Sequence, residues 1–470
     1  MSKKLKYSLL LSIYILGYTS LSFELIILRQ FVNFVGSNTL ITSIIMAFIL
    51  MFLSFGYYIG SVIRFSKYSI RKTILLIVAA LSVWYILTCS FPVISALFSI
   101  QNFFGIKSPS IQVTIASFIL LTLPSIGLGF ATSAIGRIIH HFDANYTGRF
   151  MAVDTLGSVS GSLITTLVIM PLFGVYAATT FLVFLTALVL PLTAKKHNTA
   201  FWSFLVIIIT GAAFLISNEK LLYKNASLIQ DDAVSRIEIL ETDLVEEKNL
   251  SKMLFINRSP SSKTSKKESL MFEYINYIND VFIKSLPANK THDILVLGAG
   301  GFTVGKDDTR NNYVFLDVVH NLKEISERYF LNEPLTENKT FIAQDAYLYM
   351  INDKKKYDLI LVDVYSSLHD IPVNFVTIDF FKTVKEHLNE NGVMLANIVT
   401  SPSFKSKYAT RLDNTLRSVF PNYLSRQILS SKNAYNPYTE DKRNILYIYF
   451  NYPADDTTYT LNKNSAVFGQ

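Results

Sequence analysis

Seven long apolar runs in the first half of the chain constrain its fold more than any other feature. They lie at residues 7–28, 38–62, 73–98, 112–134, 151–172, 174–194 and 200–217. A helix needs about 20 mainly apolar residues to cross the hydrocarbon core of a bilayer, and each run comes near this length. Because a helix satisfies its own backbone polar groups in lipid, the runs predict an all-α, multi-pass membrane domain. The first run resembles a signal peptide, but its length and the later runs indicate a helix that is retained.

Positive charge is concentrated in the same half. Residues 1–217 contain 13 Lys and Arg but 3 Asp and Glu, so the net charge of +8 arises there. With the N-terminus in the cytoplasm, 11 of these basic residues would lie on the inner side and only Arg29 and Lys107 outside. Basic residues collect on the cytoplasmic side of membranes, so the distribution predicts this orientation. The remainder of the chain has no basic excess, which argues against nucleic-acid binding.

The composition becomes polar after Ser217, and we place the domain boundary there. We expect a transmembrane domain at residues 1–217, a small β element and linker at 218–262, an α/β domain at 263–452 and a polar tail at 453–470. The one cysteine, Cys89, lies within an apolar run. A disulfide framework and a cysteine-based zinc site are therefore excluded, and no metal is expected.

Local patterns predict the secondary structure around this α/β domain. The expected elements are strands at 235–240 and 252–257, a polar loop at 259–267, a helix at 271–286, a helix around 408–419 and an antiparallel strand pair at 424–429 and 444–450. Aromatic residues recur at helical spacing in the helix at 271–286, and we interpret them as a packing stripe.

A glycine-rich turn between two apolar stretches is the main functional signal of the second half. One stretch ends in Gly298-Ala299-Gly300-Gly301, and the next ends in Asp317. This pattern predicts a strand, a glycine turn, a short helix and a second strand. Glycine lets the backbone approach a ligand closely, and an acid at the end of the next strand can bind the two hydroxyls of a ribose. The motif therefore predicts a crevice that binds a nucleoside.

Two further predicted strands also end in an acid. The third strand leads to Asp345 and Ala346, and the fourth leads to Asp363. In a parallel sheet the carboxyl ends of the strands share one edge, and ligands bind outside it. We therefore expect Asp317, Asp345 and Asp363 to converge at that edge. Each aspartate alone could instead cap a helix, and the repetition of the pattern favours a binding site.

These motifs resemble those of the spermidine synthase family, which are aminopropyltransferases. The resemblance covers residues 235–399 and rests on LVLGAGG, LDVVHNLKEISERYF, QDAYLYM, YDLILVDVYSS and GVMLANIV. It implies a methyltransferase-like Rossmann domain preceded by a small β element. It also implies decarboxylated S-adenosylmethionine, or S-adenosylmethionine, as a co-substrate, without a metal or a covalently bound cofactor. In the implied site Gly298, Gly300 and Gly301 lie along the nucleoside and sulfonium, Asp317 binds the ribose, and Asp345 with Ala346 lies near the adenine.

Two positions depart from the family pattern. Gly301 stands where the family has an acid that helps to hold the ammonium of the transferred group. Ser366 stands where the family has a second acid, which takes the proton from the attacking amine. A serine hydroxyl is a poor base at neutral pH. We expect Asp363 to be catalytic and to bind the amine with Tyr365 and Ser366.

Ionisable residues within membrane spans are costly and mark candidate sites. Glu24 and Arg29 lie at the end of the first run, and Asp154 lies in the first turn of the fifth. Positions near an interface also explain such residues, because long side chains reach the headgroups. The segments FELIILR and GRFMAVDTLGSVSG resemble the membrane half of bacterial proteins that fuse such spans to a spermidine-synthase-like domain, which implies a bacterial inner (plasma) membrane protein. Gly157 and Gly161 predict close helix packing.

The sequence leaves more than one function open. One hypothesis is transfer of an aminopropyl or related group from an adenosyl-sulfonium donor to an amine, with Tyr365, His369 or Asp370 as alternative bases. Another is a catalytically degenerate ligand-binding or transport-coupled domain for polyamines or nucleosides, and methyl transfer is a third. Expected partners are the lipid bilayer and such a small ligand, and a homodimer is a further option. Seven spans would place the C-terminal domain outside the cytoplasm, whereas one re-entrant run would place it inside, so its side stays open.

Overall fold

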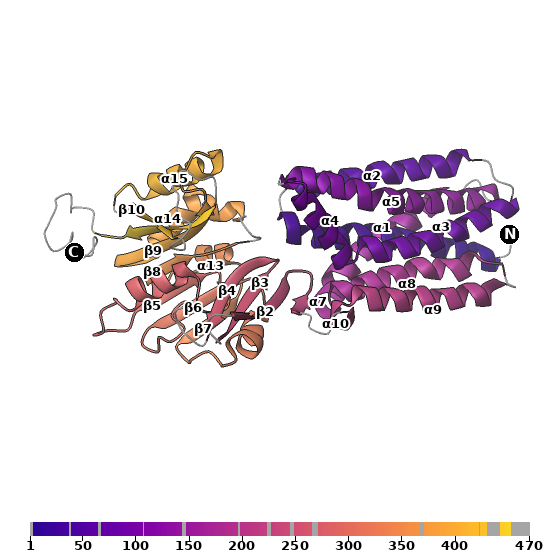
Figure 1. The fold of residues 1–470 in the computed structure, drawn as a ribbon. Coiled ribbons are helices and arrows are strands. Elements are labelled where there is room, and N and C mark those ends of the chain that lie inside the picture. Colours follow the sequence, from indigo (N-terminus) through magenta and orange to yellow (C-terminus); the bar gives the residue numbers. More distant parts are fainter. Residues whose placement is uncertain are drawn as a thin grey trace. The chain divides into compact units, whose positions relative to one another are not determined.

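The chain divides into two compact units, residues 1–237 and 238–470 (Figure 1). The computed structural model describes residues 3–36, 39–63, 67–106, 108–142, 147–195, 198–222, 227–244, 249–265, 271–365, 371–422, 424–429 and 442–452. The first unit is helical and the second is built around β-sheet, as the fold class predicted. The finer domain boundaries expected from composition stay predictions.

The first unit is a bundle of long apolar helices. Its helical elements are α1 (Lys3–Val35), α2 (Thr39–Val62), α3 (Lys67–Thr88), α4 (Phe91–Phe103), α5 (Pro109–Phe142), α6 (Thr147–Ile164), the π-helical η2 (Thr165–Ile169), α7 (Met170–Phe173), α8 (Val175–Thr193), α9 (Thr199–Ser217) and α10 (Glu219–Leu222). Within the described residues, seven helical segments are long and apolar enough to cross a membrane, at 5–35, 39–62, 70–88, 109–140, 148–173, 175–193 and 199–217. The seven predicted runs are therefore helical.

Three details of the predicted spans are wrong. The third run is two helices, because α3 ends at Thr88 and α4 begins at Phe91 with Pro92 in its first turn. Proline is favoured in a first turn, where its missing N–H has no helical partner. It does not end every helix here, since Pro124 and Pro191 lie inside α5 and α8. The first span continues to Val35, so Glu24 and Arg29 lie within α1 rather than at the end of the span. Asp154 likewise lies beyond the first turn of α6.

Glycines bring pairs of the apolar helices into backbone contact. A Cβ atom on Gly157 would lie 2.1 Å from the Tyr14 carbonyl oxygen, and one on Gly161 would lie 2.1 Å from that of Tyr18. Only glycine fits at such distances, so α6 packs directly on α1 and the predicted close packing is confirmed. A second glycine-dependent pair, α2 and α5, lies side by side in the same bundle (Figure 1).

A four-stranded sheet follows the helices. Its order is β1-β2-β3-β4, with bounds Leu228–Asp231, Arg236–Leu244, Asn249–Ile256 and Ser259–Ser265. The polar loop predicted at 259–267 is therefore wrong, because most of it is β4, which pairs antiparallel with β3. Asn257 and Arg258 have left-handed φ values of 50° and 63°, as a two-residue hairpin turn requires. The prediction failed because the residues of β4 are mostly polar and resemble those of a loop.

The second sheet has seven strands in the order β10-β11-β9-β8-β5-β6-β7 (Figure 1). Their bounds are β5 (Asp293–Leu297), β6 (Asn312–Asp317), β7 (Lys339–Ala343), β8 (Tyr357–Val362), β9 (Leu388–Thr400), β10 (Leu424–Leu429) and β11 (Arg443–Phe450). The strands from β9 to β7 are parallel, whereas β11 is antiparallel to both β9 and β10. The chain leaves central β5 first towards β6 and later returns to β8 on the other side. This doubly wound order confirms the predicted Rossmann-type domain. In such sheets ligands bind outside the carboxyl end of the strand at which the order reverses, which is β5 here.

Short helices connect these strands. They are α11 (Glu273–Tyr277) with η5 (Ile278–Ile283), α12 (Leu322–Ile325) with η6 (Ser326–Leu331), α13 (Ala346–Asn352), η7 (Val373–Val376), α14 (Ile378–Glu386) and α15 (Lys407–Val419). Ile294 to Leu297 of β5 are fully buried, as expected for a parallel strand covered on both faces. The helices at 271–286 and around 408–419 and the C-terminal strand pair are thus confirmed.

Candidate functional site

Backbone hydrogen bonds at the glycine turn connect the ends of three neighbouring strands, β5, β6 and β8. Gly298 donates its N–H to the Leu316 carbonyl at the end of β6 (2.9 Å), and Asp363 after β8 donates its N–H to the Leu297 carbonyl of β5 (2.8 Å). Gly298 has φ 93°, and a Cβ atom there would lie 2.1 Å from the Asp363 carbonyl oxygen. Only glycine permits this approach. Asp317 and Asp363 therefore flank the turn on its two sides.

Asp317 is bound by the turn itself. Its carboxylate accepts backbone N–H bonds from Ala299 and Gly300, and its Oδ1 accepts one from Val319 (3.1 Å). Burial raises its pKa to about 6, although these backbone bonds act in the opposite direction. The half-buried carboxylate is thus ionised at neutral pH and held beside the glycine turn.

Asp363 is braced on both oxygens by side chains from other elements. The Tyr274 hydroxyl, from α11, donates to Oδ2 (2.9 Å), and the Asn397 amide, from β9, donates to Oδ1 (2.8 Å). Burial raises the pKa of Asp363 to about 6, against the lowering effect of these two bonds. The fixed carboxylate can attract a cation at neutral pH and is a stronger base than an ordinary aspartate.

A second layer of hydrogen bonds orients this arrangement. Asn444 of β11 donates its side-chain amide to the Asn397 Oδ1 (2.9 Å), which fixes the Asn397 amide so that its NH₂ faces Asp363. Tyr365 donates its hydroxyl to the Asn397 carbonyl (2.9 Å) and accepts from the Val399 N–H (2.8 Å). Burial raises the pKa of Tyr365 well above its ordinary value. The Tyr365 hydroxyl is therefore a structural brace beside Asp363.

The sequence missed Tyr274 and Asn397 as site residues. Tyr274 belongs to the predicted packing stripe, and its ring does stack on Phe272, but its hydroxyl is committed to Asp363. Asn397 is buried within the otherwise apolar β9. A buried amide needs a partner, so its place in an apolar run was the signal that could have found it.

Asp345 lies on the same edge of the sheet, but its carboxylate caps a helix. Its Oδ1 accepts from the N–H groups of Tyr347 (2.8 Å) and Leu348 (3.0 Å), which caps α13, and Ala346 is the first residue of that helix. The neighbouring Gln344 N–H reaches the Asp317 carbonyl at 2.9 Å. The structure thus brings Asp317 and Asp363 to the glycine turn, whereas the Asp345 carboxylate serves its own helix. A role of Asp345 and Ala346 near an adenine stays a prediction.

Gly301 has no room for the acid that the resemblance implies. A Cβ atom there would lie 2.3 Å from a ring carbon of Phe330 and 2.9 Å from the Ser262 Cβ. The Gly301 N–H donates to the Ser262 Oγ at 2.8 Å. Ser262 belongs to β4, the strand that the sequence did not predict. This packing accounts for the glycine.

The short helix predicted after the glycine turn is wrong. The residues from 298 to 311 form turns, with left-handed φ values at Gly300, Phe302 and Gly305 of 50°, 60° and 58°. Repeated left-handed residues cannot continue a right-handed helix. Ser366, His369 and Asp370 lie outside the described residues.

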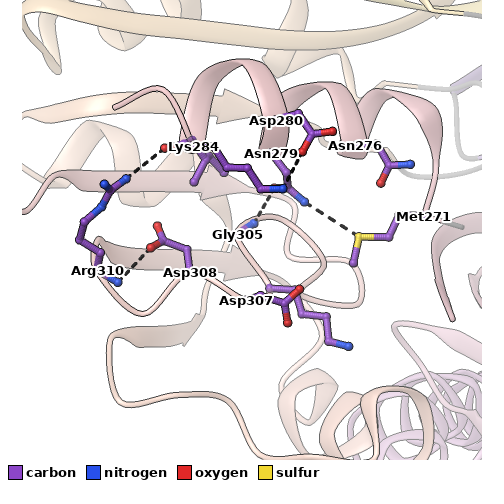
Figure 2. A pocket seen from close by; sticks show the side chains of 11 residues that line it. Met271, Asn276, Asn279, Asp280, Lys284, Gly305, Asp307, Asp308 and Arg310 are labelled. Carbon is purple, nitrogen blue, oxygen red and sulfur yellow. Dashed lines mark hydrogen bonds and ion pairs between the residues drawn. The ribbon is translucent and has the colours of Figure 1, made fainter. Parts of the chain in front are cut away.

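A cavity of about 570 Å³ lies between η5 and the loop after the glycine turn (Figure 2). Asn279 bridges its two walls, because its side chain accepts from the Gly305 N–H (2.8 Å) and donates to the Thr303 carbonyl (3.2 Å). Asp308 in this loop accepts from Tyr313 (2.7 Å), and that bond contributes to lowering its pKa. None of Asp317, Asp345 or Asp363 lines this cavity, so it is separate from the predicted site.

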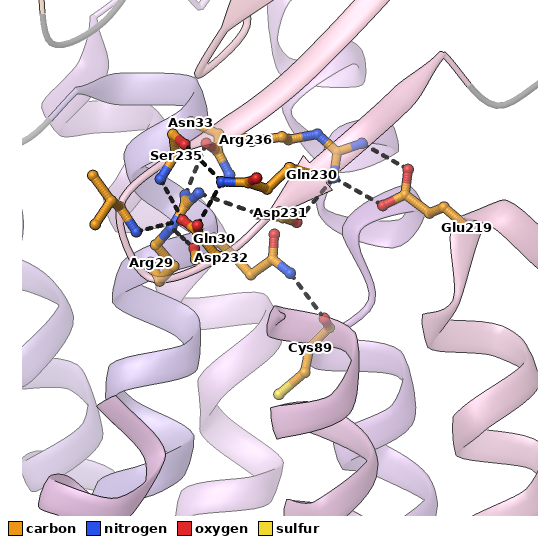
Figure 3. Close-up of polar contacts among 11 residues, drawn as sticks. Arg29, Gln30, Asn33, Cys89, Glu219, Gln230, Asp231, Asp232, Ser235 and Arg236 are labelled. Carbon is orange, nitrogen blue, oxygen red and sulfur yellow. Dashed lines mark hydrogen bonds and ion pairs between the residues drawn. The ribbon is translucent and has the colours of Figure 1, made fainter. Parts of the chain in front are cut away.

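Arg29 belongs to a buried ion-pair cluster in the first unit (Figure 3). Its guanidinium donates to Asp231 Oδ1 (3.1 Å) and to the Asp232 carbonyl (2.6 Å). Arg236 binds the other Asp231 oxygen (3.0 Å), binds Glu219 through both nitrogens (2.7 and 3.0 Å) and stacks 3.4 Å above the Phe91 ring. Arg29 therefore fastens α1 to the segment that follows the last apolar helix.

The other two membrane candidates are carboxylates without such partners. Glu24 is 6% exposed within α1, and Asp154 is half-buried within α6. Among the residues that the structure describes, neither carboxylate has a hydrogen bond or an ion pair. Their roles stay predictions.

Sequence comparison links the second unit to enzymes that transfer aminopropyl groups. The chain is 28% identical over 159 residues to a probable polyamine aminopropyl transferase of Bifidobacterium longum, a match that covers 31% of this chain and 35% of that protein. It is 30% identical over 156 residues to a polyamine aminopropyltransferase of Pyrobaculum calidifontis, covering 29% and 52%. The chain thus spans about a third to a half of the length of these relatives. No family model matches it.

A solved structure gives a weaker likeness. A probable spermidine synthase from Corynebacterium glutamicum aligns with 50% of this chain and 82% of its own, at 21% identity and a TM-score of 0.40. A score this low carries no structural argument. The resemblance of the second unit to the spermidine synthase family is confirmed by the sequence relatives.

Proposed function

We propose that this chain is a membrane-bound, spermidine synthase-like transferase that moves an aminopropyl or related group from an adenosyl-sulfonium donor to an amine. The observation that carries the proposal is Asp363, an ionised carboxylate fixed beside the glycine turn by Tyr274 and Asn397. The relatives named aminopropyltransferases support the same reaction class.

The donor would bind along the glycine turn. Gly298 and Gly300 shape this turn through left-handed φ values of 93° and 50°. Asp317 stands at the end of the next strand, where a carboxylate can accept both hydroxyls of a ribose. Its existing bonds to the Ala299 and Gly300 N–H groups hold it in place before a ligand arrives. The donor in this proposal is decarboxylated S-adenosylmethionine or a close relative.

The amine acceptor would bind at Asp363. The lone pair of the amine attacks the carbon next to the sulfonium, a C–N bond forms, the C–S bond breaks, and its electron pair returns to sulfur as a neutral thioether. The amine must lose one proton, and Asp363 is the proposed acceptor because its raised pKa brings it nearer to the working range of a base. Tyr365 is a poor alternative, since its hydroxyl is already committed and its pKa lies above the ordinary value.

A turnover assay on the full-length protein in detergent tests this proposal. We expect the neutral thioether to form from decarboxylated S-adenosylmethionine when putrescine or spermidine is present. Asp363→Asn should lower turnover at least 100-fold, because it removes both the charge and the proposed base, whose part alone is typically worth 10²–10⁴. The matched control is Asp358→Asn, at the opposite end of the same strand, where the carboxylate pairs with Lys290 at 3.5 Å.

The outcomes separate the hypotheses. Equal losses in both variants would point to general damage of β8 rather than to chemistry at Asp363. Saturable donor binding without any thioether product from the parent protein would refute transfer and leave a ligand-binding domain.

We further propose a multi-pass location in a bacterial inner membrane with a cytoplasmic N-terminus. The seven apolar helices and the distribution of basic residues support it. The helix α4, with 13 residues, is too short to add an eighth span. An odd number places the C-terminus outside, so a periplasm-active reporter fused at residue 470 should be active. Activity of a cytoplasm-only reporter would instead require one re-entrant segment.

A further inference from the structure

A second cavity, of about 660 Å³, lies within the helical unit. It is bounded by α2, α5 and α6, and its polar lining includes Tyr57, Tyr58, Arg137, His140 and Asp154. A volume of this size suits a small molecule. The transfer reaction proposed for the second unit makes no use of it.

Glycine packing explains why the bundle leaves this space. A Cβ atom on Gly56 would lie 2.2 Å from the Ile126 carbonyl, and one on Gly129 would lie 2.3 Å from that of Leu53, so α2 and α5 are in backbone contact. On the other side α6 is drawn against α1 by its own glycines, including a contact at Gly17 with the Asp154 carbonyl. The cavity lies where these two tight helix pairs, α2 with α5 and α1 with α6, meet.

The cavity lining holds one cation, Arg137, and one anion, Asp154, and no ion pair joins the two among the residues that the structure describes. Arg137 donates through one nitrogen to the carbonyls of Gly60 (2.9 Å) and Ile63 (2.6 Å), and so caps the C-terminal end of α2. The Asp154 carboxylate has no hydrogen bond or ion pair with any residue that the structure describes. A carboxylate among apolar helices is costly unless a cation accompanies it.

The neighbours of Asp154 favour an organic cation. Tyr57 and Tyr58 line the same cavity as Asp154 and contribute two phenol rings to it. Aromatic faces attract ammonium groups, and phenol oxygens accept their hydrogen bonds. Calcium and magnesium instead prefer several oxygen ligands in a compact shell, which one carboxylate in a wide cavity does not supply.

We propose that this cavity binds an organic cation with a primary ammonium group, which pairs with Asp154 between the rings of Tyr57 and Tyr58. The site is distinct from Asp363 and does not depend on the transfer reaction. The ammonium would pair with the carboxylate, and its alkyl chain would lie against the apolar part of the lining, which includes Ile139, Phe150 and Met151.

The test uses full-length protein in nanodiscs of zwitterionic phosphatidylcholine, with spermidine as the probe. Asp363→Asn serves as the parent, so that the proposed acceptor site in the second unit does not contribute. We expect saturable spermidine binding by the parent in calorimetry. Adding Asp154→Asn should weaken it at least tenfold, because a neutral amide oxygen replaces the charged acceptor of the ammonium. Asp154→Glu, which keeps the charge, should retain binding.

The control variant is Glu24→Gln. It removes the other described carboxylate of the apolar helices, which does not line this cavity, and binding should stay within twofold of the parent. Equal affinity with and without Asp154→Asn would overturn the proposal. Equal loss in Glu24→Gln would also overturn it, since the effect would then be one of helix packing. The cavity could instead bind an anionic lipid. If the purified protein retains phosphatidylglycerol, and Arg137→Gln abolishes this retention but Asp154→Asn does not, the cavity is a lipid site and the proposal is overturned.

Discussion

The hydroxyl of Tyr274 should set the pH dependence of catalysis at Asp363. It donates a hydrogen bond to Oδ2 of Asp363 at 2.9 Å, and this is one of the two bonds that oppose the effect of burial on the Asp363 pKa. A hydrogen bond to a charged group contributes about 1.5–3 kcal/mol, and one pKa unit corresponds to about 1.4 kcal/mol. Because water can replace part of the bond, we expect Tyr274→Phe to raise the pKa by about one unit.

The direction of the change in activity follows from which protonation state of Asp363 is active. Asp363 must be ionised to hold the amine and accept its proton, so activity rises with pH through about 6 in the parent protein. In Tyr274→Phe the same rise should be centred at about 7, so that activity at pH 6, expressed as a fraction of the plateau at higher pH, falls about fivefold relative to the parent protein. The assay is thioether formation measured from pH 5 to 9.

Tyr277→Phe is the matched control for this experiment. It removes a hydroxyl from the same helix, α11, at a residue whose ring packs against Phe282. Its pH profile should be unchanged. An unshifted profile in Tyr274→Phe, or an equal shift in Tyr277→Phe, would refute the assigned role of the Tyr274–Asp363 bond.

Three further predictions concern stability. Between about pH 4 and 6 the free energy of unfolding should fall as pH rises. Folded Asp317 and Asp363, each with a pKa of about 6, retain protons in this range that the unfolded chain has lost. Thermal melts measure this slope, and a slope that persists in the Asp317→Asn, Asp363→Asn double variant contradicts the explanation. Arg236→Ala should destabilise the first unit by about 3–5 kcal/mol, because the carboxylates of Asp231 and Glu219 lose a cationic partner. A loss below about 1 kcal/mol in a denaturant titration would mean that water solvates the cluster. Gly301→Asp should cost about 1–3 kcal/mol through overpacking against the ring of Phe330, and Phe330→Ala in the same chain should recover part of it; a melting temperature equal to that of the parent would show that the loop yields.

The sequence was a good guide wherever one local property decides the structure. Apolar length alone identified seven helices that are long and apolar enough to cross a membrane, because length and composition are properties of each segment separately. The break in the third span also had a local cause, Pro92, although its consequence for the count of helices was missed. Strand ends with acids were found for the same reason, since alternation and turn residues are read within a few positions.

The sequence was a poor guide to which residues meet. Tyr274 lies 89 positions from Asp363, and Asn397 lies 34 positions away, so neither contact leaves a spacing pattern. Ser262 reaches Gly301 only because β4 forms, and its polar residues resembled a loop. The absent acid at Gly301 is likewise explained by the Phe330 ring, which the sequence did not place near the turn.

The Asp345 carboxylate shows how one pattern serves two purposes. Three acids at strand ends predicted a common site, yet one of them caps α13 while Asp317 and Asp363 flank the glycine turn. Aspartate is favoured both at helix starts and in ligand crevices, so sequence alone could not separate these uses.

The most direct test of the central claim is calorimetric titration of full-length protein with 5′-methylthioadenosine, the thioether left by the proposed donor. We predict saturable binding to the parent that weakens at least tenfold in Asp317→Asn, because the ribose loses a charged hydrogen-bond acceptor. No binding to the parent, or equal affinity in the two proteins, would contradict an adenosyl site at the carboxyl ends of these strands.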